Sequence, residues 1–132
     1  MYPMDKAIEV ASRSMNKRHL TGCVIAYEDT IIDWGWAHTG EWRRGMPYSV
    51  HAEIHALMRS KHELLDGCVA YIACVAKKSG NIRNAMPCLS CATALLGYGI
   101  EDVVFTVPGG TDGMYLPAAI KTAQLKEYKK RP

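Results

Sequence analysis

The sequence predicts an α/β fold in which helices cover both faces of a central mixed sheet. Three observations carry this prediction. Helix-like and strand-like segments alternate along the 132 residues, two apolar strands are joined by a short turn, and the later strands are separated by helical segments. A helix between strands of one sheet implies at least one right-handed crossover. We therefore expect a single domain over residues 1–132, a three-layer α-β-α sandwich with four or five strands.

The first half of the chain supplies two helices and a hairpin. Residues 5–17 carry apolar side chains at helical spacing and predict the first helix. Residues 21–27 and 30–36 predict two strands, and the turn at 28–29 joins them as a hairpin. Residues 50–59 follow as a helix with apolar side chains on one side.

The second half continues the alternation. Residues 67–76 are apolar and rich in β-branched side chains, which predicts a buried strand. Residues 88–97 are rich in Ala and Leu and end at a glycine, which predicts a helix. Residues 102–107 predict a further strand, and residues 118–129 a final helix. No fifth strand is evident after that helix.

Composition limits the classes of partner. The formal net charge is +3, from 16 Lys and Arg against 13 Asp and Glu, whereas a dedicated nucleic-acid binder has a denser basic face. Basic residues cluster at 13–19, 43–44, 77–78 and 121–131. Each cluster is either ordinary solvated surface or part of a rim that attracts phosphate. Both interpretations stay open at this stage.

Cysteine usage and hydropathy indicate the compartment. Five cysteines, an odd number, favour a reducing cytosol. Cys23, Cys68 and Cys74 lie in apolar stretches and are expected to be small core residues. No apolar run reaches the roughly 18 residues of a membrane span, and the first residues lack the layout of a signal peptide. We therefore expect a cytoplasmic protein with no membrane partner.

Two short motifs carry metal-binding chemistry. His51-Ala52-Glu53 supplies an imidazole and a carboxylate, and Pro87-Cys88-Leu89-Ser90-Cys91 supplies two thiols that one metal ion can take together. His51, Cys88 and Cys91 make three ligands for zinc. Three protein ligands leave the fourth tetrahedral position open for water, which is typical of a catalytic rather than a structural zinc. The sequence therefore predicts one catalytic Zn²⁺, with Glu53 as the proton carrier for its water.

The predicted helices place both motifs at helix N-termini. His51 and Glu53 fall on the first turn of one helix, and Cys88 and Cys91 on the first turn of another. Pro87 suits a helix start. The free N–H groups and partial positive charge at such an end are expected to lower the thiol pKa.

Each motif alone has an ordinary interpretation. A His-x-Glu pair occurs often by chance, and a Cys-x-x-Cys pair can be redox-active or half of a structural zinc site. The remaining cysteines make no second Cys-x-x-Cys, which argues against the structural site. His55 is a rival ligand four residues after His51, but Ala52 replaces the general base of the H-E-x-x-H proteases. We expect His55 to be a hydrogen-bonded or core histidine.

Together the motifs match the H-x-E and P-C-x-x-C signature of zinc-dependent nucleobase deaminases. The chain resembles the cytidine deaminase-like superfamily over most of its length. Residues 21–26 followed by 31–36 are similar to the first hairpin of tRNA adenosine and deoxycytidylate deaminases, and residues 99–104 to the lead into the strand after the second zinc helix. His51 in place of cysteine points to the branch of deoxycytidylate, tRNA and polynucleotide deaminases.

The resemblance implies a hydrolase that acts on the C–N bond of a cyclic amidine and assembles as a homo-oligomer. Glu53 would take a proton from the zinc-activated water and deliver it to the ring nitrogen. The backbone N–H groups around Ala52 and the carbonyls near Pro87 would contact the exocyclic amine and the base edge.

One position departs from the family pattern. Relatives often place Asn directly after a glycine-aromatic pair, where it contacts the substrate, whereas Ala37 follows Gly35-Trp36 here. Either His38 or Thr39 takes over that contact, or the substrate lies differently. Trp36 and the neighbouring aromatics are candidates to stack on a base or simply to pack; these aromatics are Trp34, Trp42 and Tyr48.

Three functions remain open from the sequence. The first is deamination of a cytosine nucleotide (dCMP/cytidine type) to its uracil form with release of ammonia, a reaction of nucleotide metabolism on a small-molecule substrate. The alternative is deamination of a base within nucleic acid, either tRNA adenosine or single-stranded DNA cytosine. The third is a non-catalytic zinc module, against which the carboxylate of Glu53 argues.

Overall fold

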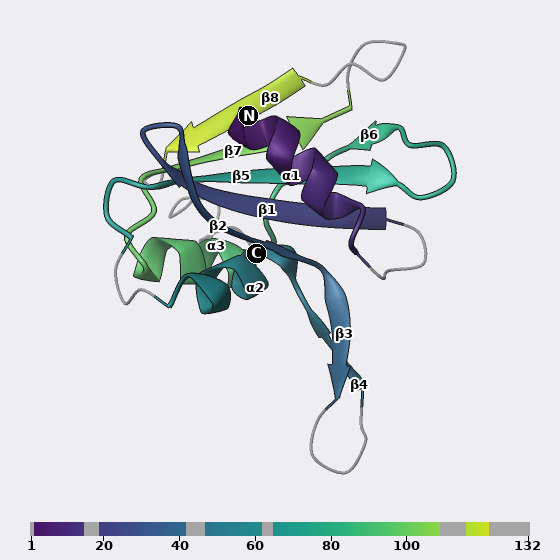
Figure 1. Cartoon of the computed structure of the whole chain (residues 1–132), viewed down its shortest axis with the longest axis horizontal. Helices are drawn as coiled ribbons and strands as arrows, with labels where there is room; N and C mark the ends of the chain where they lie inside the picture. The colour runs from purple at the N-terminus through teal and green to yellow at the C-terminus, as the bar shows by residue number, and fades with distance from the viewer. Residues whose placement is uncertain (1, 15–18, 42–46, 62–64, 109–115, 122–132) are drawn as a thin grey trace.

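Helices lie on both faces of one twisted sheet, with α1 (Pro3–Ala11) on one face and α2 (Ala52–Ser60) and α3 (Leu89–Gly97) on the other (Figure 1). The computed structural model describes residues 2–14, 19–41, 47–61, 65–108 and 116–121. The predicted α-β-α sandwich is confirmed by this arrangement.

The sheet has the strand order β2-β1-β5-β7-β8, and the short strand β6 also pairs with β5. The parallel pair β5–β7 makes the sheet mixed, since the other pairings are antiparallel. β6 and α3 form the connection between the two parallel strands. The bounds are β1 (His19–Tyr27), β2 (Thr30–Trp36), β5 (Val69–Ala76), β6 (Ile82–Arg83), β7 (Asp102–Val107) and β8 (Leu116–Lys121).

The β1–β2 hairpin follows from its turn. Glu28 and Asp29 both have positive φ, at 47° and 66°. Two successive left-handed residues match the right-handed twist of the flanking strands. β2 has the predicted bounds, and β1 begins slightly before the predicted Thr21.

Two glycines set how closely the helices approach the sheet. A Cβ on Gly22 would lie 2.6 Å from the backbone nitrogen of Ala11 in α1. A Cβ on Gly35 would lie 2.8 Å from the carbonyl oxygen of Ala52 in α2. Because neither glycine carries a side chain, both helix backbones can rest on the strands. Gly35 in particular lies against the start of α2, next to the His51-Ala52-Glu53 motif.

Each face of the sheet has its own core. Cys23, Ile25, Ile72 and Leu95 belong to the core between the sheet and α2–α3. The core beneath α1 is smaller; its fully buried members include Met4, Ala7, Val24, Ala26 and Ala73. The three cysteines expected in the core, Cys23, Cys68 and Cys74, are all buried.

The predicted final helix over residues 118–129 is wrong in its described part. Residues 118–121 lie in β8, which pairs antiparallel with β7, for example Val103 with Ile120. The alanines there favour a helix locally, but the open edge of β7 offers a full ladder of backbone hydrogen bonds. Pro117 fits this placement because an edge strand tolerates a residue without N–H. Residues 122–129 lie outside the described residues.

Other boundaries also differ. α1 ends at Ala11, where the Ser12 hydroxyl donates to the Glu9 carbonyl, rather than at the predicted Lys17. α2 begins at Ala52 because Val50 belongs to β4 (Pro47–Val50), which pairs with β3 (His38–Glu41). This second hairpin and the short strand β6 were not predicted.

Candidate active site

His51 and Cys88 occupy equivalent places in the fold, each immediately before a helix. His51 is the N-cap residue of α2 and Cys88 that of α3, both with extended backbone at ψ of 151° and 167°. Neither of these two side chains caps its own helix. Both are therefore free to turn towards a shared point beyond the helix ends. The predicted first-turn placement of Glu53 and Cys91 also holds.

Three donor atoms meet at that point. His51 Nδ1 lies 3.2 Å from Cys91 Sγ and 3.5 Å from Cys88 Sγ. All three atoms lie within 4.8 Å of one another, and this is the one such metal-compatible group found among the described residues. A tetrahedral zinc with ordinary Zn–N and Zn–S bonds places nitrogen and sulfur about 3.5 Å apart. The donor set and its spacing thus fit one zinc ion.

The three donors differ in exposure. Cys91 is buried, Cys88 is half-buried and His51 is exposed. Burial raises the pKa of the Cys91 thiol well above its usual range, and the neighbouring Glu53 carboxyl raises it further. Here desolvation outweighs the effect expected of the helix N-terminus. A divalent cation is the group that would stabilise the thiolate at such a place.

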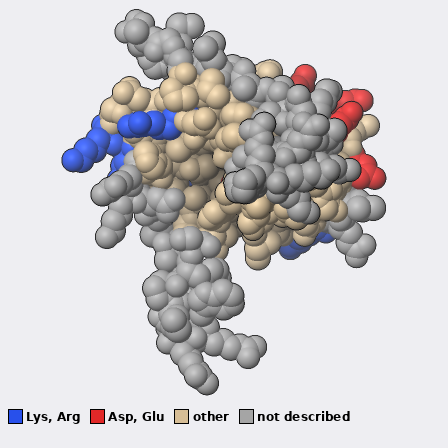
Figure 2. Space-filling view, turned by 180° about the vertical axis from the view of Figure 1, so that it is seen from behind, with Lys and Arg blue, Asp and Glu red and all other residues tan. Residues whose placement is uncertain are grey.

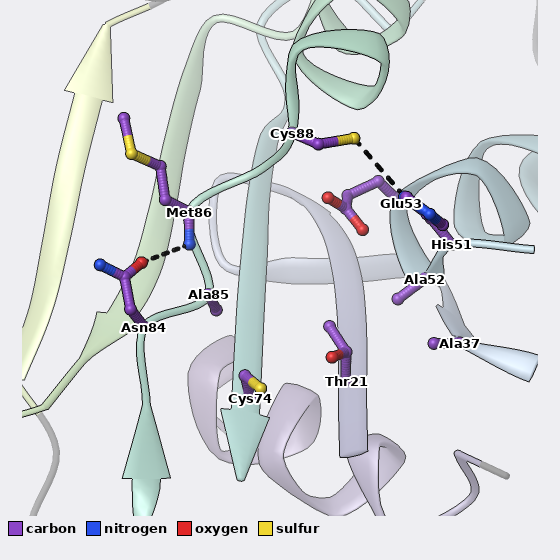
Figure 3. A pocket seen from close by; sticks show the side chains of 10 residues that line it. All are labelled: Thr21, Ala37, His51, Ala52, Glu53, Cys74, Asn84, Ala85, Met86 and Cys88. Atoms are coloured by element: carbon purple, nitrogen blue, oxygen red, sulfur yellow. Dashed lines mark hydrogen bonds between the residues drawn. The ribbon is translucent and has the colours of Figure 1, made fainter. Parts of the chain in front are cut away.

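Glu53 stands beside the donor set without belonging to it. Its side chain is 5% exposed, and Figure 3 shows its carboxylate at the pocket wall near Cys88 and His51. Burial raises the pKa of Glu53, while its own backbone N–H, the charge of His51 and a hydrogen bond with Cys91 act in the opposite direction. A buried carboxyl with a raised pKa is suited to accept and return a proton near neutral pH.

A pocket of about 230 Å³ opens next to these groups. Thr21 of β1 and Cys74 of β5 form its floor as direct cross-strand partners. Its walls carry small methyl groups from three alanines. Among the described residues, the lining consists of Thr21, Ala37, His51, Ala52, Glu53, Cys74, Asn84, Ala85, Met86 and Cys88 (Figure 3).

Some of the predicted substrate contacts lie at the pocket and others do not. Ala37 and Ala52 line the pocket, and Pro87 is buried between the lining residues Met86 and Cys88. Trp36 and His38 are not among its lining residues in the described chain. His38 turns instead to the Trp36 carbonyl, with its Nδ1 2.8 Å from that oxygen.

His55 is held at the edge of the sheet. Its Nδ1 accepts a hydrogen bond from the Trp36 backbone N–H at 3.1 Å. Its ring centroid lies 4.5 Å from those of Trp36 and His38. Burial lowers the pKa of His55, and the positive charges of His38 and Arg59 lower it further. The expectation of a hydrogen-bonded histidine is met.

The two indoles on β2 are surrounded by cations. Lys6 lies 4.5 Å above the ring of Trp34, and the guanidinium groups of Arg13 and Arg59 lie 5.2–5.9 Å from Trp34 and Trp36. Such contacts stabilise packing and account for both rings without a bound base. Trp42 and the side chain of Tyr48 lie outside the described residues.

Sequence reasoning missed half of the pocket. Thr21 and Asn84 carry no motif, and Cys74 was assigned to the core alone. Ala85 and Met86 directly precede the cysteine motif, which was a usable signal. For Thr21 and Cys74 the only signal is the register of β1 against β5, which the structure supplies.

None of the helices in the described ranges is long and apolar enough to cross a membrane.

Comparison with known proteins shows which family of proteins this chain is similar to. A family model described as the cytidine and deoxycytidylate deaminase zinc-binding region matches residues 1–107. The deoxycytidylate deaminase of Homo sapiens is 27% identical over 121 residues, which cover 79% of this chain and 62% of the relative. The chain thus spans less than two thirds of the length of that relative.

Solved structures share the fold. The apo dCMP deaminase of cyanophage S-TIM5 superposes with a TM-score of 0.60 at 24% identity, covering 85% of this chain and 83% of the other. The cytidine deaminase of Burkholderia pseudomallei superposes with a TM-score of 0.62 at 12% identity, covering 93% and 92%.

Proposed function

This chain belongs to the family of cytidine and deoxycytidylate deaminases, and on that basis we propose that it is a zinc-dependent hydrolytic deaminase. Its substrate is a cytosine nucleotide of the dCMP/cytidine type. Water replaces the exocyclic amine, so that the uracil form and ammonia leave.

The observation that carries this proposal is the convergence of His51, Cys88 and Cys91 beside the buried carboxyl of Glu53. A purely structural zinc site would have a fourth protein ligand and no need of that carboxyl. Three donors and a separate proton carrier are what hydrolysis requires.

His51 would hold the zinc ion through Nδ1, and Cys88 and Cys91 through their sulfur atoms. When bound, zinc supplies an activated water as the nucleophile. Glu53 acts on protons only: it takes one from the water and delivers it to the ring nitrogen, and it then takes the remaining proton of the hydroxyl added to the ring carbon and passes it to the departing amine, so that ammonia leaves as the carbonyl forms. Its buried position keeps competing water away from these transfers.

The rest of the pocket orients the base. The methyl groups of Ala37, Ala52 and Ala85 give the pocket small apolar lining groups, which suit the faces of a planar ring. Ala52 is the first residue of α2, and Pro87 directly precedes Cys88, the N-cap residue of α3. In this proposal the Ala52 backbone N–H contacts the base edge and the Pro87 carbonyl contacts the amino group. Ala37 offers no side-chain hydrogen bond, so the sugar must be held by other groups.

Ammonia release from a substrate panel tests this function. The zinc-loaded chain is assayed with deoxycytidine, dCMP, dCTP, adenosine, guanine, single-stranded DNA and tRNA, and Glu53→Ala serves as the blank. We expect turnover of a free cytosine nucleotide that the variant lacks, since general acid–base catalysis contributes about 10²–10⁴-fold.

Turnover restricted to a polymer would replace the proposal with deamination of a base within nucleic acid. If a zinc-loaded, folded protein released no ammonia from any substrate, the proposal would give way to a non-catalytic zinc module.

A further inference from the structure

A row of three cross-strand neighbours runs from the pocket floor to the β5–β6 hairpin. Thr21 in β1 pairs with Cys74 in β5, and Cys74 pairs with Arg83 in β6. Directly paired residues on neighbouring strands place their side chains on the same face of a sheet. Thr21 and Cys74 line the pocket. Arg83 therefore extends the pocket face by one strand, about 5 Å further on, a distance that an arginine side chain can span.

The backbone at Arg83 is fixed by a buried hydroxyl. Thr106 in β7 is fully buried, and its Oγ1 accepts a hydrogen bond from the Cys74 N–H at 3.2 Å. The same hydroxyl donates to the Arg83 carbonyl at 2.8 Å. The Thr106 carbonyl in turn accepts the Ala85 N–H at 2.9 Å. Thr106 is thus hydrogen-bonded to Cys74 in the pocket floor, to Arg83, and to Ala85 in the pocket-lining segment after Arg83.

The guanidinium of Arg83 is available for a ligand. Arg83 is exposed, and the ion pairs within the described ranges join other residues, Lys6 with Glu9 and Arg59 with Asp33. The charge of Arg83 also acts on Cys74 in the pocket floor. Burial raises the pKa of Cys74, while a hydrogen bond with Thr21 and then the charge of Arg83 act in the opposite direction.

Charge is divided between the two ends of the sheet. Figure 2 shows most of the visible Lys and Arg at one end of this face, with a few more at its lower edge, and Asp and Glu at the other end. Lys77 and Lys78 are exposed in the turn after β5, whereas Glu28 and Asp29 form the β1–β2 turn. β1 and β5 are antiparallel, so these two turns lie at opposite ends. Thr21 and Cys74 of the pocket lie towards the Lys77–Lys78 end of these strands, where such a field concentrates anions.

We propose that Arg83 binds the phosphate of a nucleoside monophosphate and thereby makes the chain selective for nucleotides over nucleosides. The planar guanidinium can hold two phosphate oxygens at once. Lys77 and Lys78 add attraction at longer range. The identity of the base rests on the proposed function, whereas the phosphate contact does not require turnover.

Binding of the reaction product tests the contact without catalysis. Calorimetric titration of zinc-loaded protein with dUMP and with deoxyuridine compares the wild type with Arg83→Gln. Hydrogen bonds to charged groups contribute about 1.5–3 kcal/mol, so we expect the variant to bind dUMP about 10- to 100-fold more weakly. Affinity for deoxyuridine should stay the same. Arg83→Lys should recover part of the loss.

Lys78→Gln is the matched control, because it removes one charge from the same hairpin outside the cross-strand row. We expect it to weaken dUMP binding less than about 3-fold, as a screened long-range charge does. In kinetics, Arg83→Gln should raise KM for dCMP and leave kcat for deoxycytidine unchanged. Circular dichroism checks that the exposed substitution preserves the fold.

The outcomes separate the two proposals. Equal dUMP affinity in wild type and Arg83→Gln, or an equal loss in Lys78→Gln, would overturn the role of Arg83. A wild type that deaminates deoxycytidine but binds dUMP no better than deoxyuridine would overturn it too, while the proposed function stands. Arg83-dependent dUMP binding without any deamination would support the phosphate contact and reject the activity.

Discussion

His51 and His55 stand four residues apart at the start of α2, yet the structure gives them different partners. His51 precedes the helix, and its Nδ1 faces the sulfur atoms of Cys88 and Cys91. His55 lies within the helix, and its Nδ1 accepts the backbone N–H of Trp36 at the edge of β2. The two imidazoles therefore use the same atom for different purposes.

The difference shows what helical spacing can and cannot decide. Residues four apart share a helix face, so spacing alone makes both histidines candidate ligands. His51, however, has an extended backbone as the N-cap residue, which turns its side chain beyond the helix end. His55 instead meets the unpaired edge of a strand, where an N–H needs an acceptor. Neighbouring elements, rather than spacing, assign the roles.

Zinc affinity should separate the two histidines most strongly. We expect His51→Ala to lose more than about 100-fold in zinc affinity, since altering groups that merely support a ligand already costs 10- to 100-fold. His55→Ala should keep the wild-type stoichiometry. Competition with a chromophoric chelator measures both. Equal losses in the two variants would mean that His55 takes part in the site.

Gly35 supports both histidines, because α2 packs directly on it. We expect Gly35→Ala to destabilise the fold by about 2 kcal/mol or more, as the new methyl would press on the backbone of Ala52 and Ala56. Gly97→Ala is the control: a Cβ there meets nothing within 4 Å, and alanine favours a helix by up to about 1 kcal/mol. Urea unfolding compares the two variants. A neutral Gly35→Ala would show that α2 can move away from β2 at little cost.

The cluster of His51, Cys88 and Cys91 was predictable because its residues belong to two motifs that are local in sequence. His51-Ala52-Glu53 and Pro87 to Cys91 each fix residue types at short spacing, and both begin helices whose apolar pattern is readable. The β1–β2 hairpin was predictable for the same reason, since its turn and alternating strands lie within one short segment.

The rest depends on contacts between distant segments. Thr21 and Cys74 become a pocket floor only through the register of β1 against β5, which no local pattern encodes. Residues 118–121 form a strand because β7 offers an open edge, although Ala118 and Ala119 favour a helix. Cys74 illustrates the limit well, since it is both a core residue, as predicted, and part of the pocket floor.

Substitution of Arg59, which packs beside His55 at the edge of β2, should have a smaller effect on stability. Its Nε lies 3.2 Å from Asp33 Oδ1, and its guanidinium lies over both Trp34 and Trp36. We expect Arg59→Met, which keeps an apolar stem, to lower the free energy of unfolding by about 0.5–1 kcal/mol. Arg13→Met, which removes a more distant guanidinium, should cost less. The reverse order in urea unfolding would contradict the assigned packing.

The smallest effect is the pH dependence of His55. Burial, then His38 and Arg59, lower its pKa, and these outweigh the nearby Asp33 carboxylate, which raises it. The folded protein therefore holds the neutral ring as acceptor for Trp36, and an unfolded histidine protonates near its ordinary pKa of about 6.5. Stabilisation from the neutral ring is complete above that value and is lost as the pH falls from it towards the folded pKa.

His55→Asn places a non-titrating acceptor near the position of Nδ1. We expect wild type to lose more stability than His55→Asn between pH 7.5 and pH 5 in urea unfolding, with His51 and the thiols common to both proteins. A difference that stays constant with pH would mean that His55 is not held neutral at the strand edge.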